Sequence, residues 1–151
     1  MKILLVEDEG PKRENVKAVL EHLGLIDFVE EAHSVGSAIK SLRKIKFDLV
    51  ILDMSLPTFD IIPGESGGRP QGFGGVEVLR YMDRFKANVP TIVVTAYPAF
   101  SQGDKEIDLT SLSESLKRDH PNTFVALVFY NSMFSTWKEE LSARVSEALA
   151  V

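Results

Sequence analysis

The sequence predicts an α/β fold in which a parallel sheet is covered by helices on both faces. Residues 3–6 and 49–52 are short, almost continuous apolar segments, which is the pattern of strands buried on both sides. Stretches with apolar residues at the 3, 4 and 7 spacing of a helix follow them. Five strands alternating with five helices imply parallel pairing with right-handed crossovers, within one domain over residues 1–151.

Each element follows from a local pattern. The expected strands, all rich in apolar or β-branched residues, cover residues 3–6, 26–32, 49–52, 89–95 and 123–130. The expected helices, all with one apolar face, cover residues 11–23, 34–44, 75–85, 108–119 and 136–149. Pro11 suits a first helical turn and Gly24 a C-terminal cap. The pairs Ser111 and Glu114, and Thr136 and Glu139, have the spacing of capping boxes for the last two helices.

Two segments lack a helical or alternating pattern. Residues 58–74 contain two prolines and five glycines and predict a long loop. Loops longer than about 12 to 15 residues are uncommon in compact domains and are usually functional or disordered. Residues 99–107 are polar and predict an irregular connection before the fourth helix.

Composition excludes several classes of function. A formal net charge of -5 argues against general binding of nucleic acids or acidic membranes. The chain has no cysteine, so disulfides and thiolate metal sites are excluded, which fits a reducing cytoplasm. The apolar start of the chain is too short for a signal peptide core or a membrane span. We therefore expect a cytoplasmic protein without direct nucleic-acid or membrane contacts.

Acidic residues follow two of the buried strands. Asp53 comes directly after residues 49–52, and Glu7 and Asp8 come directly after residues 3–6. The carboxyl ends of strands form the ligand crevice of open α/β sheets. A carboxylate there can attack phosphorus if the charge on the phosphoryl oxygens is neutralised. Converging acids need a cation, and hard oxygen ligands suit Mg²⁺.

The strand ends occur in an order found in one known family. The residues that carry the likeness are Val6-Glu7-Asp8, Leu52-Asp53-Met54 with Pro57 four positions on, Gly75 at the start of the third helix, and Val94-Thr95-Ala96. Over nearly its whole length the chain resembles the receiver domain of two-component response regulators. The resemblance implies a flavodoxin-like (βα)5 fold, with a doubly wound parallel five-stranded sheet in the order 2-1-3-4-5.

The resemblance also implies roles for single residues. Asp53 would be the phosphoacceptor and, with Asp8, a direct Mg²⁺ ligand. Glu7 would bind the ion through water, and the backbone carbonyl of Ser55 would be a further ligand. Thr95 would donate its hydroxyl to a phosphoryl oxygen, and its movement would be the switch.

Three departures from the family stand out. The gap from Pro57 to Gly75 is much longer than usual and would lie over the crevice, so the loop is a candidate lid; for Arg69, a solvated side chain is the first interpretation and a contact to the phosphate the second. The family has a lysine followed by proline at the end of its fifth strand, but this strand ends Val128-Phe-Tyr-Asn-Ser. Lys138 comes too late in the chain, so loss of a fixed positive charge is expected either to weaken phosphoryl transfer or to change how the switch responds to it.

The third departure concerns output. Tyr130 is the candidate for the family's switch aromatic. The segment between Thr95 and the fifth strand is longer than usual and adjoins the face of the fourth helix, fifth strand and fifth helix through which receivers commonly signal. This predicts an unusual partner.

Three functions remain in competition. The first is a non-enzymatic phosphoacceptor receiver that a sensor histidine kinase or phosphotransfer protein phosphorylates, and that signals to a downstream protein or forms a homodimer. The second is a pseudo-receiver that binds proteins without phosphorylation, supported by the absent lysine and the long loop. The third, a haloacid-dehalogenase-like phosphatase, fits poorly because Ser55 occupies the place of its second acid. The acceptor is also not on the first strand. If the chain ends where the sequence does, we expect it to act by protein contact.

Overall fold

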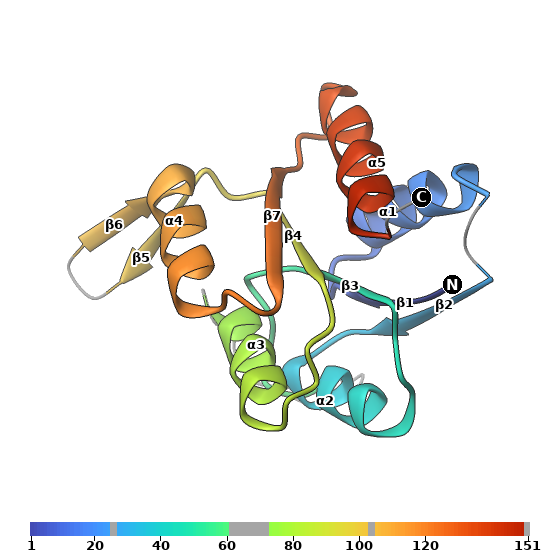
Figure 1. Cartoon of the computed structure of the whole chain (residues 1–151). Helices are drawn as coiled ribbons and strands as arrows, with labels where there is room; N and C mark the ends of the chain where they lie inside the picture. The colour runs from blue at the N-terminus through green and yellow to red at the C-terminus, as the bar shows by residue number, and fades with distance from the viewer. Residues whose placement is uncertain (25–26, 61–72, 103–104, 150–151) are drawn as a thin grey trace.

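Five parallel strands form one sheet in a computed structural model that describes residues 1–24, 27–60, 73–102 and 105–149. The sheet order is β2-β1-β3-β4-β7, which confirms the predicted order (Figure 1). Its strands, in chain order, are β1 (Lys2–Val6), β2 (Phe28–Ala32), β3 (Leu49–Leu52), β4 (Thr91–Thr95) and β7 (Phe124–Phe129). The helices are α1 (Gly10–His22), α2 (Val35–Lys44), α3 (Gly74–Arg84), α4 (Leu109–Asp119) and α5 (Thr136–Ala148).

Helices cover both faces of the sheet, and each face has its own apolar core. On one side α1 and α5 pack against Leu49 and Ile51 of β3, and on the other α2, α3 and α4 pack against Val50 and Leu52 (Figure 1). All four residues of β3 are buried. The uninterrupted apolar pattern of this strand therefore reflects a position between two layers of helices.

The register of the sheet brings the acidic strand ends together. Val6 of β1 lies opposite Ala32 of β2 and Leu52 of β3. The Asp53 amide then donates to the Val6 carbonyl oxygen at 3.0 Å. Parallel strands in this register end at the same edge, so residues 7, 8 and 53 leave the sheet side by side.

The predicted irregular connection over residues 99–107 is wrong. Its place is taken by an antiparallel pair, β5 (Ala99–Gln102) and β6 (Lys105–Asp108), in which Ala99 lies opposite Asp108 (Figure 1). A hairpin closes its own backbone hydrogen bonds, so it needs no strong apolar alternation to form. The hairpin stands beside the main sheet and precedes α4 directly.

The two predicted capping boxes are also wrong. α4 begins at Leu109, and its N-cap is Asp108, whose side chain accepts a hydrogen bond from the Ser111 amide at 2.8 Å, so Ser111 lies inside the helix. α5 has Ser135 at its N-cap position, without a side-chain cap bond. In the described ranges, no helix has both the length and the apolar character needed to cross a membrane.

The start of α2 is tied to the segment that follows β3. Ser34 is fully buried, and its hydroxyl accepts a hydrogen bond from the Ser37 amide at 3.1 Å and donates one to Asp60 at 2.6 Å. The hydrogen bonds from Ser34 and Ser37 outweigh partial burial and hold the pKa of Asp60 below its ordinary value. The Val35 amide also donates to the Pro57 carbonyl oxygen. These bonds anchor the first residues of the predicted loop.

Ser34→Ala is expected to lower the free energy of unfolding by about 1 to 2 kcal/mol, because the variant loses an N-cap. Urea unfolding followed by Trp137 fluorescence would measure the change. Ser41→Ala, further along the same helix, is the control and should change stability by less than about 0.5 kcal/mol. Equal losses in the two variants would contradict a capping role.

Candidate functional site

Three carboxylates meet where β1 and β3 end. Glu7, Asp8 and Asp53 each place one carboxylate oxygen within 4.8 Å of the others. Glu7 is 2% exposed and Asp53 is 6% exposed, while Asp8 is partly open to solvent. The structure thus brings together the acids that the sequence predicted.

The turn after Asp53 lies directly against the start of α3. The Gly75 amide donates to the Met54 carbonyl oxygen at 2.9 Å. A Cβ at position 75 would lie 2.6 Å from the Asp53 carbonyl oxygen and 3.0 Å from Met54 Cα. Only glycine leaves space for this approach, which fixes the backbone that carries Asp53.

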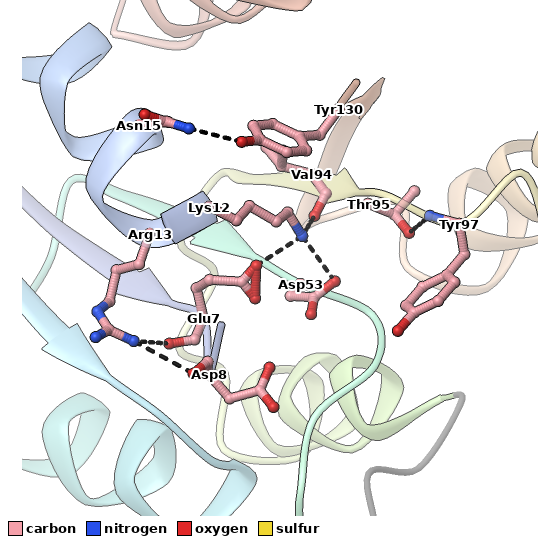
Figure 2. A network of polar contacts seen from close by, with 10 residues as sticks. All are labelled: Glu7, Asp8, Lys12, Arg13, Asn15, Asp53, Val94, Thr95, Tyr97 and Tyr130. Atoms are coloured by element: carbon pink, nitrogen blue, oxygen red, sulfur yellow. Dashed lines mark hydrogen bonds and ion pairs between the residues drawn. The ribbon is translucent and has the colours of Figure 1, made fainter. Parts of the chain in front are cut away.

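A buried lysine from α1 reaches the acids (Figure 2). Lys12 is 2% exposed, and its ammonium lies 2.7 Å from Glu7 Oε1 and 3.1 Å from Asp53 Oδ1. It also donates to the Val94 carbonyl oxygen at 2.8 Å. The sequence correctly showed no lysine at the end of the fifth strand of the main sheet, but the expected loss of a fixed positive charge is wrong. The fixed positive charge comes from Lys12 of α1 instead of from the strand.

The charges in this cluster are not balanced. Burial, then the charge of Asp53, raises the pKa of Glu7 to about 9, although Lys12 opposes both effects. The same two causes raise the pKa of Asp8. Burial by itself would lower the pKa of Lys12, but Asp53 and Glu7 raise it above its ordinary value. Three carboxyl groups face one ammonium, and the raised pKa values of Glu7 and Asp8 show that added positive charge in the crevice would favour their ionised forms.

The donor set fits Mg²⁺. Asp8, Asp53 and Ser55 line one cavity of about 280 Å³ together with Lys12 and Tyr97. Both carboxylate oxygens of Glu7 and Oδ1 of Asp53 are buried and receive no hydrogen bond from the residues that the structure describes. Magnesium prefers hard oxygen ligands and keeps several of its waters, which a small open cavity allows. A larger hollow of about 640 Å³ lies at the opposite edge, lined by residues 42–48 and 86–90.

Thr95 ends β4 and is fully buried. Its hydroxyl oxygen accepts a hydrogen bond from the Tyr97 amide at 3.2 Å (Figure 2). A hydroxyl that accepts one bond can still donate its proton. The predicted switch threonine therefore lies at the same edge of the sheet as the acids, with its oxygen engaged by the backbone.

Tyr130 directly follows β7 and turns toward α1. Its hydroxyl accepts a hydrogen bond from the Asn15 side chain at 2.7 Å (Figure 2). The centre of its ring lies 4.7 Å from that of Trp137. The same ring centre is 5.9 Å from Lys12 Nζ. Arg69 and most of the expected lid fall within residues 61–72, which lie outside the described residues.

Sequence reasoning missed Lys12, although the chain contained a signal. Lys12 lies in the first turn of α1, where the helix dipole disfavours a positive charge. A cation at that place, four residues after Asp8 and facing the end of a strand, indicates pairing with nearby acids.

Known proteins resemble this chain in sequence and in structure. The sequence model of the response regulator receiver domain matches residues 3–110. The uncharacterized protein y4jR of Sinorhizobium fredii is 30% identical over 150 residues, covering 97% of this chain and 98% of its own. The Detocs response regulatory protein DtcB of Vibrio alginolyticus is 27% identical and covers 91% of this chain and 95% of its own.

Solved structures agree on the fold. The receiver domain of the sensor histidine kinase PA1611 from Pseudomonas aeruginosa superposes with a TM-score of 0.63 at 20% identity, covering 99% of this chain and 98% of its own. That structure holds a magnesium ion in its active site cleft. The family match spans most of the main sheet and includes every acid of the crevice. The chain therefore belongs to the response regulator receiver domain family.

Proposed function

We propose that the protein is a phosphoacceptor receiver, in which a histidine kinase or phosphotransfer protein phosphorylates Asp53. The observation that carries the proposal is the pairing of a buried Asp53 with the Lys12 ammonium at 3.1 Å, beside two further carboxylates. Mg²⁺ would be held by Asp8, Asp53 and the Ser55 carbonyl, with Glu7 acting through water. We place the protein in the cytoplasm, as its lack of cysteine suggests, and assign it signalling rather than enzymatic activity.

The chemistry follows from these positions. A carboxylate oxygen of Asp53 bonds to phosphorus, while the bond from phosphorus to the donor atom breaks and the donor leaves with the electron pair. Bound Mg²⁺ would neutralise charge on the phosphoryl oxygens. Lys12 holds the acceptor in place, and the rigid turn against Gly75 keeps the backbone of Asp53 from moving away.

The switch would begin at Thr95. Its hydroxyl proton can turn toward a phosphoryl oxygen, which would disturb the bond from the Tyr97 amide. We retain Tyr130 as the candidate switch aromatic, since its bond to Asn15 links β7 to α1. A downstream protein or a second copy would bind the face of α4, β7 and α5, where Val125 and Phe129 of β7 are partly exposed.

One observation favours the alternative of a pseudo-receiver. The Lys12 ammonium already lies at ion-pair distance from Glu7 and Asp53 and donates a hydrogen bond to the Val94 carbonyl, so its charge is paired without a phosphoryl group. Such a site could serve only to hold the fold together while the protein binds its partner.

Phosphorylation with acetyl phosphate and Mg²⁺ separates the two functions. We expect intact mass spectrometry to show one added phosphoryl group in the native protein and none in Asp53→Asn, which keeps the side-chain shape but removes the nucleophile. Asp119→Asn, an exposed acid at the end of α4, is the control and should be phosphorylated normally. An unmodified native protein at high donor concentration would refute the phosphoacceptor function and leave the pseudo-receiver.

A further inference from the structure

We propose that Lys12 of α1 is a catalytic residue of this receiver and supplies, from a helix, the charge that its relatives supply from the end of a strand. The inference rests on the proposed phosphorylation of Asp53 and adds a residue to it. Lys12 contacts the acceptor carboxylate, which is one of the reacting groups.

The partners of the Lys12 ammonium fix its position in the site. Burying a lysine is costly unless its charge is paired and its hydrogen bonds are satisfied. The described structure pairs the Lys12 ammonium with the carboxylates of Glu7 and Asp53 at ion-pair distance and gives it a hydrogen bond to the Val94 carbonyl. The charge is therefore held at the acceptor acid before any phosphoryl group arrives.

Lys12, on α1, and Tyr130, directly after β7, both lie beside the acidic site. The Tyr130 amide donates to the Thr95 carbonyl oxygen at 2.8 Å, which puts residue 130 at the site edge of the sheet. The family places its lysine at this end of the strand, but here a tyrosine stands there and turns its hydroxyl to Asn15. Its ring centre lies 5.9 Å from Lys12 Nζ. A lysine at position 130 would thus start beside the ammonium that Lys12 now provides.

Phosphorylation would redirect one bond of this ammonium. As Asp53 becomes an acyl phosphate, its carboxylate loses its charge, the donor leaves with the electron pair, and the phosphoryl oxygens bring their own negative charge to the site. The Lys12 ammonium, now 3.1 Å from Asp53 Oδ1, would then form a charge-assisted hydrogen bond to a phosphoryl oxygen. The bonds to Glu7 and Val94 can remain, so Lys12 need not leave its place.

Moving the lysine between the two positions tests the proposal. Lys12→Met removes the charge at similar length, and Lys12→Met with Tyr130→Lys returns a charge from the strand. We expect phosphoryl uptake from acetyl phosphate to be slower by about tenfold or more in Lys12→Met, because an electrostatic contact to the transferring group is lost. The double variant should recover most of the rate. Lys17→Met, on the same helix but paired with Glu31, is the control and should match the native protein.

A second measurement does not depend on phosphorylation. Mg²⁺ titration followed by the fluorescence of Trp137, which packs on Tyr130, reports the affinity of the acids for the ion. Removing a neighbouring positive charge should tighten Mg²⁺ binding by about tenfold, and the double variant should return it toward the native value.

The outcomes distinguish this proposal from the one on which it rests. Normal uptake in the native protein and in Lys12→Met alike, with unchanged Mg²⁺ affinity, would overturn the role of Lys12 alone. No uptake in any variant would overturn both proposals. If Lys12→Met does not fold, the double variant decides: a folded, phosphorylated protein supports the inference, and a folded but inert one overturns it.

Discussion

Gly75→Ala is expected to lower the free energy of unfolding by about 3 kcal/mol, at the upper end for overpacking. The added Cβ would lie 2.6 Å from the Asp53 carbonyl oxygen, a backbone atom that cannot turn aside. Either α3 or the turn that carries Asp53 must shift. Because that shift moves the acceptor carboxylate away from Lys12, phosphoryl uptake should fall together with stability.

Urea unfolding would measure the loss in Gly75→Ala. Gly10→Ala is the matched control, since Gly10 also lies in the first turn of a helix but its Cβ would meet only Arg13 Nη2, at 3.8 Å. Alanine is the better helix former, so this control should be neutral or slightly stabilising. If Gly75→Ala and Gly10→Ala were equally stable, the close approach of position 75 to the Asp53 carbonyl oxygen would not restrict the side chain there.

Lys12→Met is expected to cost about 3 kcal/mol of stability in the absence of Mg²⁺. Breaking a buried ion pair by removing one partner leaves uncompensated charge in the interior. Here two carboxylates, those of Glu7 and Asp53, lose the same partner. Added Mg²⁺ should restore part of the loss, because it binds the folded protein and supplies positive charge to the same acids.

A double-mutant cycle would show whether the stability lost in Lys12→Met comes from the ion pair between Lys12 and Asp53. If Lys12 acts through Asp53, the free energies of Lys12→Met and Asp53→Asn should not add, and the coupling should be about 1 to 3 kcal/mol. Lys17→Met removes a partly exposed ion pair and should cost less than about 1 kcal/mol. Additive effects of Lys12→Met and Asp53→Asn would contradict a direct interaction.

The sheet could be predicted from the sequence because its signals are local and strong. β3 and β4 are short apolar runs, and all their residues are buried between two layers of helices. The acids at the strand ends followed from the same reasoning, since parallel strands deliver their last residues to one edge. Glu7, Asp8 and Asp53 meet there as predicted.

The hairpin of β5 and β6 could not be recognised by apolar periodicity. Its strands are four residues long and polar, and the backbone bonds between them carry the structure. The available signal was the Gly103-Asp104 dipeptide between them, a sequence typical of two-residue hairpin turns.

Lys12 was missed for a different reason. Its partners are close in space because the turn after β1 folds α1 back over the end of the sheet, and one of them, Val94, is 82 residues away. A helical pattern shows which residues face the core, and a lysine on that face contradicts the pattern. Only the geometry of the acids explains why a charged residue belongs there.

The short distance in sequence between these charges has a practical consequence. Glu7, Asp8 and Lys12 lie within one hexapeptide, Glu-Asp-Glu-Gly-Pro-Lys, so two of the acids and their counter-charge are inherited together. A survey that recognises active receivers by a lysine at the last strand would class this chain as degenerate. A search for Glu-Asp followed by lysine four residues after the aspartate would test whether other receivers that lack the strand-end lysine carry the charge on their first helix.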